Sequence, residues 1–489
     1  MAVLRFLSMC LCVLVVVPFP SSTQPINFVL PKLSDLPSPG DLFNKFQTDM
    51  EQIKNDFSAM KAEMDELEMP PIDWDAMAEV REAVLEYIND PKGNCDKIPH
   101  GKSEDPEVHM TPCELVKHLG YPCEDYEVVT EDGYILGIQR IPYGKGQKPG
   151  PRPVAFLQHG LLDSAATWVA NLANESLGTV LADAGYDVWM GNVRGNTYSK
   201  GHTKLDPLKD KAYWEFSWDE MACFDLPAMI NYALLISGQP KLYYIGHSQG
   251  TMIGFARFSE DQELAQKVEY FFALGPVTTV GAIKSPMRLL APFSKNIKFL
   301  YYALGGNGEF LSSSPLIRWL GRTVCREPVG VICENILFLV AGFDCTDLNV
   351  TRIPVYVSHT PAGTSVQNVV HFAQQVQTKK FQAYDYGRTG NLKHYNQTTP
   401  HEYHPENLKI PVALYWGGKD WLADPKDVEL LIQKLVHIDH NQYIPSFDHL
   451  DFVWGLGGDK LVYQDVITVM KKHPIQVIGQ SHDALHEGL

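Results

Sequence analysis

Five short apolar runs, with helical stretches between them, constrain the fold of this chain more than any other feature. They span 154–157, 187–190, 242–245, 270–274 and 412–416. Strands buried on both faces have continuous apolar runs, and helical connections make neighbouring strands parallel. We therefore expect an α/β fold with a mainly parallel sheet between two layers of helices. Ahead of these runs, a turn at Asp132-Gly133 between two strand-like segments predicts a β-hairpin.

One interval in this pattern is too long for a crossover connection. About 135 residues separate Leu274 from Val412, far more than a helical crossover needs. We expect an inserted subdomain, whose apolar stretches at 299–302 and 337–340 suit a cap over an apolar site. The expected division is a signal peptide at 1–23, an acidic helical extension at 24–94, a core at 95–276 and 411–475, a cap or lid insertion at 277–410, and a C-terminal tail at 476–489.

The first residues indicate a secretory signal peptide. Arg5 precedes a mostly apolar run over 6–19, and small residues suit cleavage near Thr23. A membrane anchor is the alternative, but the run is shorter than the roughly 20 residues that span a bilayer. Three N-x-S/T sequons agree with the secretory route. They predict glycosylation at Asn174, Asn349 and Asn396.

Cysteine usage fits an oxidising compartment. Cleavage leaves Cys95, Cys113, Cys123, Cys223, Cys325, Cys333 and Cys345. An odd number leaves at least one free thiol or an intermolecular bond. The residues themselves do not assign partners to Cys95, Cys113, Cys123 or Cys345. Cys223 lies in a helical stretch, and we expect it to be a buried free thiol.

Residues 24–94 differ in charge from the rest of the chain. They hold fifteen acidic and six basic side chains, and so carry −9 of the chain's net charge of −17. Apolar residues over 43–67 alternate spacings of three and four, which predicts an amphipathic helix. We expect its apolar stripe to fold back on the enzyme. Self-association through 43–67 and contact with a lipid surface are the alternatives.

Composition and motif spacing exclude several classes of function. The chain is 45% hydrophobic and 20% charged, which is globular composition, and its net charge of −17 argues against a nucleic-acid-binding face. No interior run reaches the ~18 apolar residues of a stable membrane span. His401-Glu-Tyr-His404 lacks the H-E-x-x-H spacing, and no Cys/His cluster has metal-ligand spacing. We expect neither a metal nor a cofactor.

The chemistry is expected at a G-x-S-x-G motif spanning Gly246 to Gly250. The pentapeptide alone is common, but here it joins an apolar strand to a helical run. That context is typical of a nucleophile elbow, a sharp turn that lifts the serine hydroxyl above a sheet. Ser248 is therefore the expected nucleophile. The alternative is an ordinary turn with a passive serine.

A serine nucleophile needs a base, and the base needs an orienting acid. In this architecture the acid and then the histidine follow the serine in sequence. Asp420 follows an apolar strand through two glycines and is the expected acid. Its rivals are Asp427 and Asp424, and Asp424 better suits capping the helix at 428–436. The expected base is His449, just past a short strand. Most other histidines after the serine are expected in the cap, on helix faces or in solvated loops: His359, His371, His394, His401, His404, His437 and His440.

Acyl transfer also needs two N–H donors for the oxyanion. One is expected from the residue after the nucleophile, Gln249. The other is expected from the loop after the strand at 154–157, where Leu161 follows a glycine that gives the backbone room. Four separate segments thus supply four roles in the expected order.

Long motifs cover the chain from 106 to 470. Those around the candidate residues are Gln158-His-Gly-Leu-Leu, Gly246-His-Ser-Gln-Gly and His449-Leu-Asp-Phe. Pro361-Ala-Gly-Thr-Ser-Val-Gln-Asn is another, and further stretches lie at 120–122, 129–136, 181–189, 194–197, 381–387 and 422–425. Together they resemble the acid lipase family of gastric and lysosomal acid lipases and their invertebrate relatives.

The resemblance implies an α/β-hydrolase core with a cap and lid. It implies that the family's catalytic triad falls on Ser248, Asp420 and His449. The family's oxyanion donors fall on Leu161 and Gln249. No cofactor is implied.

The resemblance also implies a cap disulfide between Cys325 and Cys333. The chain departs from the family in three respects. A further cap cysteine of vertebrate members corresponds to Ala341, three cysteines are additional (Cys113, Cys123 and Cys345), and the extension at 24–94 has no counterpart.

The expected function is that of a secreted or lysosomal serine lipase. It would hydrolyse neutral lipid esters, triacylglycerol first, through an acyl-enzyme at a lipid–water interface. A sterol ester is the alternative substrate, because the sequence does not define the size of the pocket. A non-catalytic lipid-binding relative is a further alternative, but all three triad residues are present.

Overall fold

The computed structural model describes residues 105–285, 288, 291, 294, 298, 307–311 and 347–479. Several sequence predictions lie outside these residues and stay predictions. They are the signal peptide at 1–23, the extension at 24–94 with its helix at 43–67, the Cys325–Cys333 pair and positions 480–489 of the tail.

A nine-stranded sheet forms the centre of the described part of the chain. Its strands are β1 (Glu124–Val129), β2 (Tyr134–Ile141), β3 (Val154–Gln158), β4 (Asp187–Gly191), β5 (Gly201–His202), β6 (Leu242–His247), β7 (Val268–Leu274), β10 (Val412–Gly417) and β11 (Ile438–Ile444). The order is β1-β2-β4-β3-β6-β7-β10-β11, with β5 paired to β2. From β4 to β11 every pairing is parallel, whereas β2 is antiparallel to β1, β4 and β5. The expected mainly parallel sheet and the hairpin at Asp132-Gly133 are confirmed.

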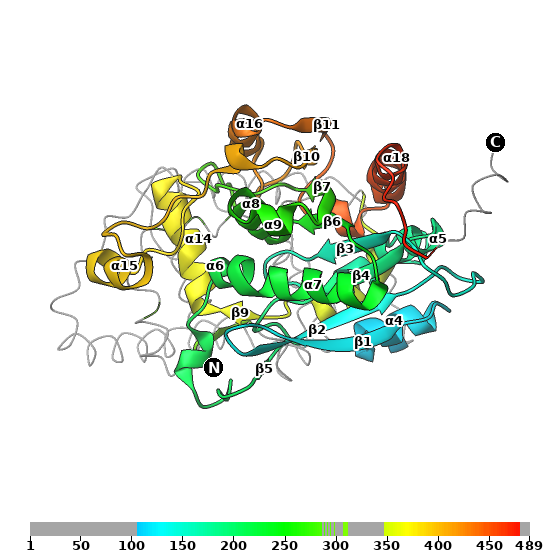
Figure 1. The fold of residues 1–489 in the computed structure, drawn as a ribbon, viewed down its shortest axis with the longest axis horizontal. Helices are drawn as coiled ribbons and strands as arrows, with labels where there is room; N and C mark the ends of the chain where they lie inside the picture. Colours follow the sequence, from blue (N-terminus) through cyan, green and yellow to red (C-terminus); the bar gives the residue numbers. More distant parts are fainter. Residues whose placement is uncertain are drawn as a thin grey trace, which may run out of the picture.

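Helices cover both faces of the sheet (Figure 1). Alternate residues of the central strands pack in the two cores: in β6, Tyr243 and Ile245 pack on one face and Leu242 and Tyr244 on the other. The first core is closed by α4 (Pro112–His118), α5 (Leu177–Asp183), α13 (Ile353–His359), α17 (Asp451–Trp454) and α18 (Gln464–Lys472). The second is closed by α6 (Trp218–Glu220), the π-helix η5 (Met221–Asp225), α7 (Leu226–Ser237), α8 (Gln249–Glu260), α9 (Gln262–Ala265) and α16 (Pro425–Lys434). This burial on both faces explains why the central strands β3, β4, β6, β7 and β10 are mostly apolar, whereas β1 and β11 at the edges of the sheet alternate with polar, exposed residues.

The described residues between β7 and β10 add α13, α14 (Val366–Thr378), α15 (Gly387–Tyr395) and a two-stranded ladder of β8 (Glu309–Phe310) with β9 (Thr364–Ser365). In Figure 1, α14 and α15 lie beyond α6 and α8 at one end of the molecule. Arg352 joins this stretch to the short 3₁₀ helix Pro106–His109 near the start of the described residues. Its buried guanidinium pairs with Glu107 and donates to the Ala170 carbonyl. The boundaries at 277 and 410 stay predictions.

The described structure contains a disulfide bond whose partners the sequence did not assign. Cys113 and Cys123 form a disulfide across ten positions, between α4 and the start of β1. Cys223, in η5, is a free thiol, as expected, although it is half-buried where full burial was expected, and desolvation raises its pKa to about 12. A disulfide agrees with an oxidising compartment.

Two of the three predicted glycosylation sites are on the surface. Asn174 and Asn396 are exposed. Asn349 is half-buried, and its amide Nδ2 donates to Asn171 Oδ1 at 3.4 Å and Glu175 Oε2 at 3.2 Å. A glycan on Asn349 would have to displace those contacts. Within the described ranges, no helix is both long and apolar enough to cross a membrane.

Candidate active site

Ser248 occupies the turn between β6 and α8. Its backbone has φ 55° and ψ −121°, a positive φ that residues other than glycine rarely adopt. The turn is held on both sides: the Ser248 N–H donates to the Leu274 carbonyl at 3.1 Å, and the Ser248 carbonyl accepts from the Thr251 hydroxyl at 2.6 Å. This is the geometry of a nucleophile elbow.

The two glycines of the motif are needed because backbones meet here. A Cβ on Gly250 would lie 2.2 Å from the carbonyl oxygen of Gln158, at the end of β3. A Cβ on Gly246 would lie 2.8 Å from the backbone of Gly250. The sharp turn therefore packs directly against the neighbouring strand, and any side chain would push the two apart.

Asp420 and His449 meet at the carboxyl ends of β10 and β11. The His449 ring donates from Nδ1 to Asp420 Oδ2 at 2.8 Å. The other carboxylate oxygen, Oδ1, accepts the backbone N–H groups of Leu422 at 2.9 Å and Ala423 at 2.7 Å. Both side chains are buried, so the carboxylate is fixed and orients the imidazole.

The two rival carboxylates have other partners. Asp424 caps α16 by accepting the Lys426 N–H at 2.9 Å, as expected. Asp427 accepts the Thr279 hydroxyl at 2.8 Å and the Ala282 N–H at 2.7 Å. Of the three acids, Asp420 alone contacts His449 in the described structure.

The remaining histidines divide into two groups. His394, His404 and His437 are exposed, and His401 and His440 are half-buried. His359 and His371 are buried, which the expectation of solvated histidines in this region did not foresee. Polar partners make this burial possible: His371 Nδ1 lies 3.0 Å from Ser217 Oγ, and Nε2 lies 2.9 Å from the Gln382 carbonyl oxygen. Burial lowers the pKa of both histidines to about 4.

The loop with the first candidate oxyanion donor lies against the serine. A Cβ on Gly160 would be 2.9 Å from Ser248 Cβ and 3.4 Å from its Oγ. The loop is tied down by His159, whose Nε2 accepts the Val193 N–H at 3.2 Å and whose pKa burial lowers to about 4. Leu161 is the next residue of this loop after Gly160.

Gln249, the second candidate donor, is the first residue of α8. Its side chain is 2% exposed, so the amide needs protein partners. Oε1 accepts from Asn368 Nδ2 at 2.7 Å, and Nε2 lies 3.3 Å from the Met221 sulfur. The backbone N–H of Gln249 is the first of α8. It therefore has no hydrogen-bond acceptor within the helix and can face an oxyanion.

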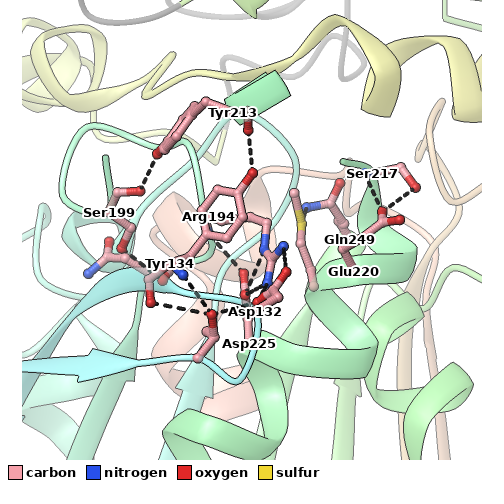
Figure 2. A network of polar contacts seen from close by, with 12 residues as sticks. Asp132, Tyr134, Arg194, Ser199, Tyr213, Ser217, Glu220, Asp225 and Gln249 are labelled. Carbon is pink, nitrogen blue, oxygen red and sulfur yellow. Dashed lines mark hydrogen bonds and ion pairs between the residues drawn. The ribbon is translucent and has the colours of Figure 1, made fainter. Parts of the chain in front are cut away.

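A buried ionic cluster lies near the start of the elbow helix (Figure 2). Figure 2 shows Arg194 between Asp132 and Asp225, with Gln249 on the neighbouring helix. The guanidinium donates to Asp225 Oδ1 at 2.8 Å and to Asp132 Oδ2 at 2.6 Å. Burial opposes the charge, but the two carboxylates raise the pKa of Arg194 above its usual range. Arg194 therefore fixes the hairpin turn, the end of β4 and η5 together.

One hydrogen bond of the expected triad, between His449 and Ser248, is not formed in the described structure. His449 Nε2 is buried and has no hydrogen-bond partner among the described residues, so no such bond joins it to Ser248. The His449 backbone is bonded to the residue before the serine: His247 donates from Nε2 to the His449 carbonyl at 2.9 Å. Catalytic hydrogen bonds often shorten only when substrate binds.

No group of three or more His, Cys, Asp or Glu side chains in the described ranges could hold a metal ion. The arrangement supports nucleophilic chemistry by a serine with a histidine base.

Comparison with known proteins identifies the family. Residues 113–172 match the family described as a partial alpha/beta-hydrolase lipase region, and residues 153–456 match the alpha/beta hydrolase fold. Human lysosomal acid lipase/cholesteryl ester hydrolase is 48% identical over 374 residues, covering 76% of this chain and 92% of that protein. Rat gastric triacylglycerol lipase is 47% identical over 369 residues, covering 75% and 92%. The chain belongs to the acid lipase family.

Membership of the acid lipase family confirms the resemblance inferred from the motifs, and with it the α/β-hydrolase fold. Human lipase member K, another member, is 45% identical over 377 residues, covering 76% of this chain and 94% of that protein. The fold match at 153–456 includes the candidate residues Ser248 and His449.

Sequence reasoning missed two residues that contact the candidate site. Gly275, with φ +54°, leaves room for His449: a Cβ there would lie 3.3 Å from Nδ1. His247 holds the His449 backbone, as described above. Their signals were present, because His247 lies inside the G-x-S-x-G motif and Gly275 directly follows β7.

Proposed function

We propose that this acid lipase family member is a serine lipase that hydrolyses neutral lipid esters, with Ser248, Asp420 and His449 as its catalytic triad. One observation carries the proposal: a buried histidine, oriented by a buried carboxylate at 2.8 Å, is hydrogen-bonded through its carbonyl to His247, the residue before a serine held in an elbow conformation. The approach of Gly160 to Ser248, and the position of Gln249 as the first residue of α8, support Leu161 and Gln249 as its oxyanion donors.

The residues support acyl transfer in two halves. His449 Nε2 takes the Ser248 proton as the hydroxyl attacks the ester carbonyl, and then gives it to the leaving alcohol. Leu161 and Gln249 donate N–H groups to the oxyanion of the tetrahedral intermediate. Water, deprotonated by His449, then cleaves the acyl-enzyme and releases the fatty acid. Asp420 keeps the imidazole in the required tautomer throughout.

The proposed first substrate is triacylglycerol, and a sterol ester is the second. Both have support from relatives: rat gastric triacylglycerol lipase bears one activity in its name, and the human lysosomal relative is also named a cholesteryl ester hydrolase. Turnover of triolein against cholesteryl oleate between pH 4 and 8 decides between them. Faster turnover of the sterol ester at every pH would reverse the order.

The proposed surroundings follow from the signal peptide, the sequons and the relatives. We place the enzyme outside the cell or in the lysosome, acting at a lipid–water interface. Self-association through 43–67 stays a prediction from the sequence. Comparing the oligomeric state of the full chain with that of a chain lacking 24–94 tests it.

The test of the function is Ser248→Ala. We expect kcat on a soluble short-chain ester to fall by about 10⁴-fold or more, with unchanged thermal unfolding. Ser259→Ala is a matched control, since Ser259 is a buried serine at the far end of α8 whose hydroxyl donates to the Ala256 carbonyl. A Ser248→Ala enzyme that retained a tenth of the activity would refute the assignment.

A further inference from the structure

The stretch 360–368 contacts Gln249 and also the two residues that follow Leu161, although it is far from both in sequence. Its last residue, Asn368, lies in the first turn of α14 and is fully buried. Its Nδ2 donates to Gln249 Oε1 at 2.7 Å and to Thr364 Oγ1 at 3.0 Å. Its Oδ1 accepts the backbone N–H of Trp218 at 2.9 Å. One amide thus joins α14, the start of α6 and the first residue of the elbow helix.

The other end of this stretch holds the loop that carries Leu161. The Ala362 N–H donates to the Leu162 carbonyl at 2.6 Å, and Leu162 has a positive φ of 61°. One residue further along that loop, Asp163 Oδ1 accepts the Thr360 hydroxyl at 2.9 Å. The donor loop is therefore fixed by the same short stretch that fixes Gln249.

Asn368 is the strong partner of the Gln249 side chain. The other contact of that side chain, Nε2 to the Met221 sulfur, uses a weak acceptor. In Figure 2 the Gln249 side chain lies beside the ionic cluster of Arg194, Asp132 and Asp225. Because Gln249 directly follows the strained Ser248, the direction of its N–H depends on how firmly this residue is held.

We propose that Asn368 is a positioning residue for the oxyanion hole: through Gln249, and together with the Thr360 and Ala362 contacts, it fixes the separation of the two donors. The proposal rests on the proposed function. It gives the Pro361-Ala-Gly-Thr-Ser-Val-Gln-Asn motif a role in catalysis without any contact to substrate. Donors that stabilise an oxyanion act only when they are held in place before the charge develops.

A merely structural role for Asn368 predicts a different result. Its backbone N–H donates to Ser365 Oγ at 2.9 Å and its Oδ1 caps α6, so its loss could lower stability alone. A structural defect lowers the amount of folded enzyme. A displaced donor lowers transition-state stabilisation in every folded molecule, and so changes kcat with little change in KM.

The experiment compares Asn368→Leu with the control Asn391→Leu on a soluble short-chain ester. Asn391 is also a buried asparagine in the same region, but its amide serves Asp385, Tyr386 and Thr398 instead of the elbow. We expect Asn368→Leu to lower kcat by about 10- to 100-fold and to change KM by less than about twofold. The control should retain kcat within about threefold even if it unfolds at a lower temperature.

An inhibitor provides the second readout. An alkyl trifluoromethyl ketone forms a tetrahedral oxyanion adduct with a serine nucleophile, so its affinity reports on the oxyanion hole. We expect Asn368→Leu to weaken inhibition by the same factor by which it lowers kcat/KM. Asn368→Asp, which keeps the acceptor for the Trp218 N–H but loses the donor to Gln249, serves if the leucine variant does not fold, and should weaken inhibition as well.

A double-mutant cycle with Gln249→Met completes the test, because this change removes the side-chain amide and keeps the backbone N–H. If Asn368 acts through Gln249, the double variant is no slower than the worse single variant. Multiplicative losses in kcat, or an Asn368 variant with unchanged kcat and unchanged ketone affinity, would overturn the proposal. A Ser248→Ala enzyme that stays active would instead overturn the proposed function, so the two failures are distinguishable.

Discussion

Ser248 has a backbone conformation that costs about 1–3 kcal/mol for a residue with a side chain. Contacts with the surrounding residues offset this free-energy cost. The Leu274 carbonyl accepts the serine N–H, the Thr251 hydroxyl and N–H donate to the serine carbonyl, and Gly160 leaves room beside the serine Cβ. The elbow is therefore a property of three strand ends, β3, β6 and β7. The pentapeptide alone does not produce it.

At the same scale, the identity of the orienting acid can be tested by two matched changes. We expect Asp420→Asn to lower kcat by about 10³–10⁴-fold, because the amide can no longer hold His449 in the correct tautomer. Asp424→Asn should leave kcat nearly unchanged and cost less than about 1 kcal/mol of stability, since asparagine also caps helices well. Ester turnover and thermal unfolding of both variants measure this. A larger loss of activity in Asp424→Asn would show that the acid is misassigned.

Secondary-structure elements were predictable where a local pattern encodes them. The five apolar runs became β3, β4, β6, β7 and β10 with boundaries shifted by one or two residues, because strands buried on both faces leave a pattern that is visible locally. The order of the candidate residues along the chain was likewise encoded by the position of each one after a strand.

Long-range partners were not predictable. Asn368 and Gln249 are 119 positions apart, and no periodicity links them. The burial of His371 depends on Ser217 and Gln382, whose approach only the tertiary fold creates. The π-helix η5 was expected only as part of a helical stretch, since a single π turn has no sequence pattern of its own.

The disulfide between α4 and β1 leads to a prediction about the stability of the fold. Closing a loop of ten residues restricts the unfolded chain, so we expect the double change Cys113→Ala/Cys123→Ala to lower the free energy of unfolding by about 2–3 kcal/mol. Denaturant unfolding measures it. Cys223→Ala, which removes a free thiol, is the control. Equal stability of the disulfide-free protein and the control would contradict the prediction.

Over the whole molecule, buried acids and buried histidines have opposite effects on stability. Burial raises the pKa values of Asp163 and Asp219 to about 6, so these groups weaken the fold as pH rises from about 4 to 6. Burial lowers the pKa values of His159, His359 and His371 to about 4, so these groups weaken the fold as pH falls from about 6.5 to 4. The two sets partly cancel, which suits a protein placed in the lysosome or outside the cell.

Removing one histidine should disturb this balance in a defined direction. The unfolded chain binds a proton at His371 between pH 6.5 and 4 and the folded chain does not, so acid costs the wild-type stability that His371→Gln does not lose. We expect the melting temperature of the variant, relative to wild type, to rise as pH falls from 7 to 4.5. The exposed His437→Gln provides the control. A difference that stays constant with pH would contradict the assignment of a neutral, buried His371.

The contacts of 360–368 also bear on how this enzyme can be recombined with its relatives. By position this stretch belongs to the expected insertion, but by contact it belongs to the elbow, through Ala362 and Asn368. A chimera that exchanges whole insertions to change substrate preference would exchange part of the catalytic support as well. The useful crossover points therefore lie before Thr360 and after the end of α14. The segment from Thr360 to the end of α14, with its hydrogen bond from Asn368 to Gln249, then stays that of the host enzyme.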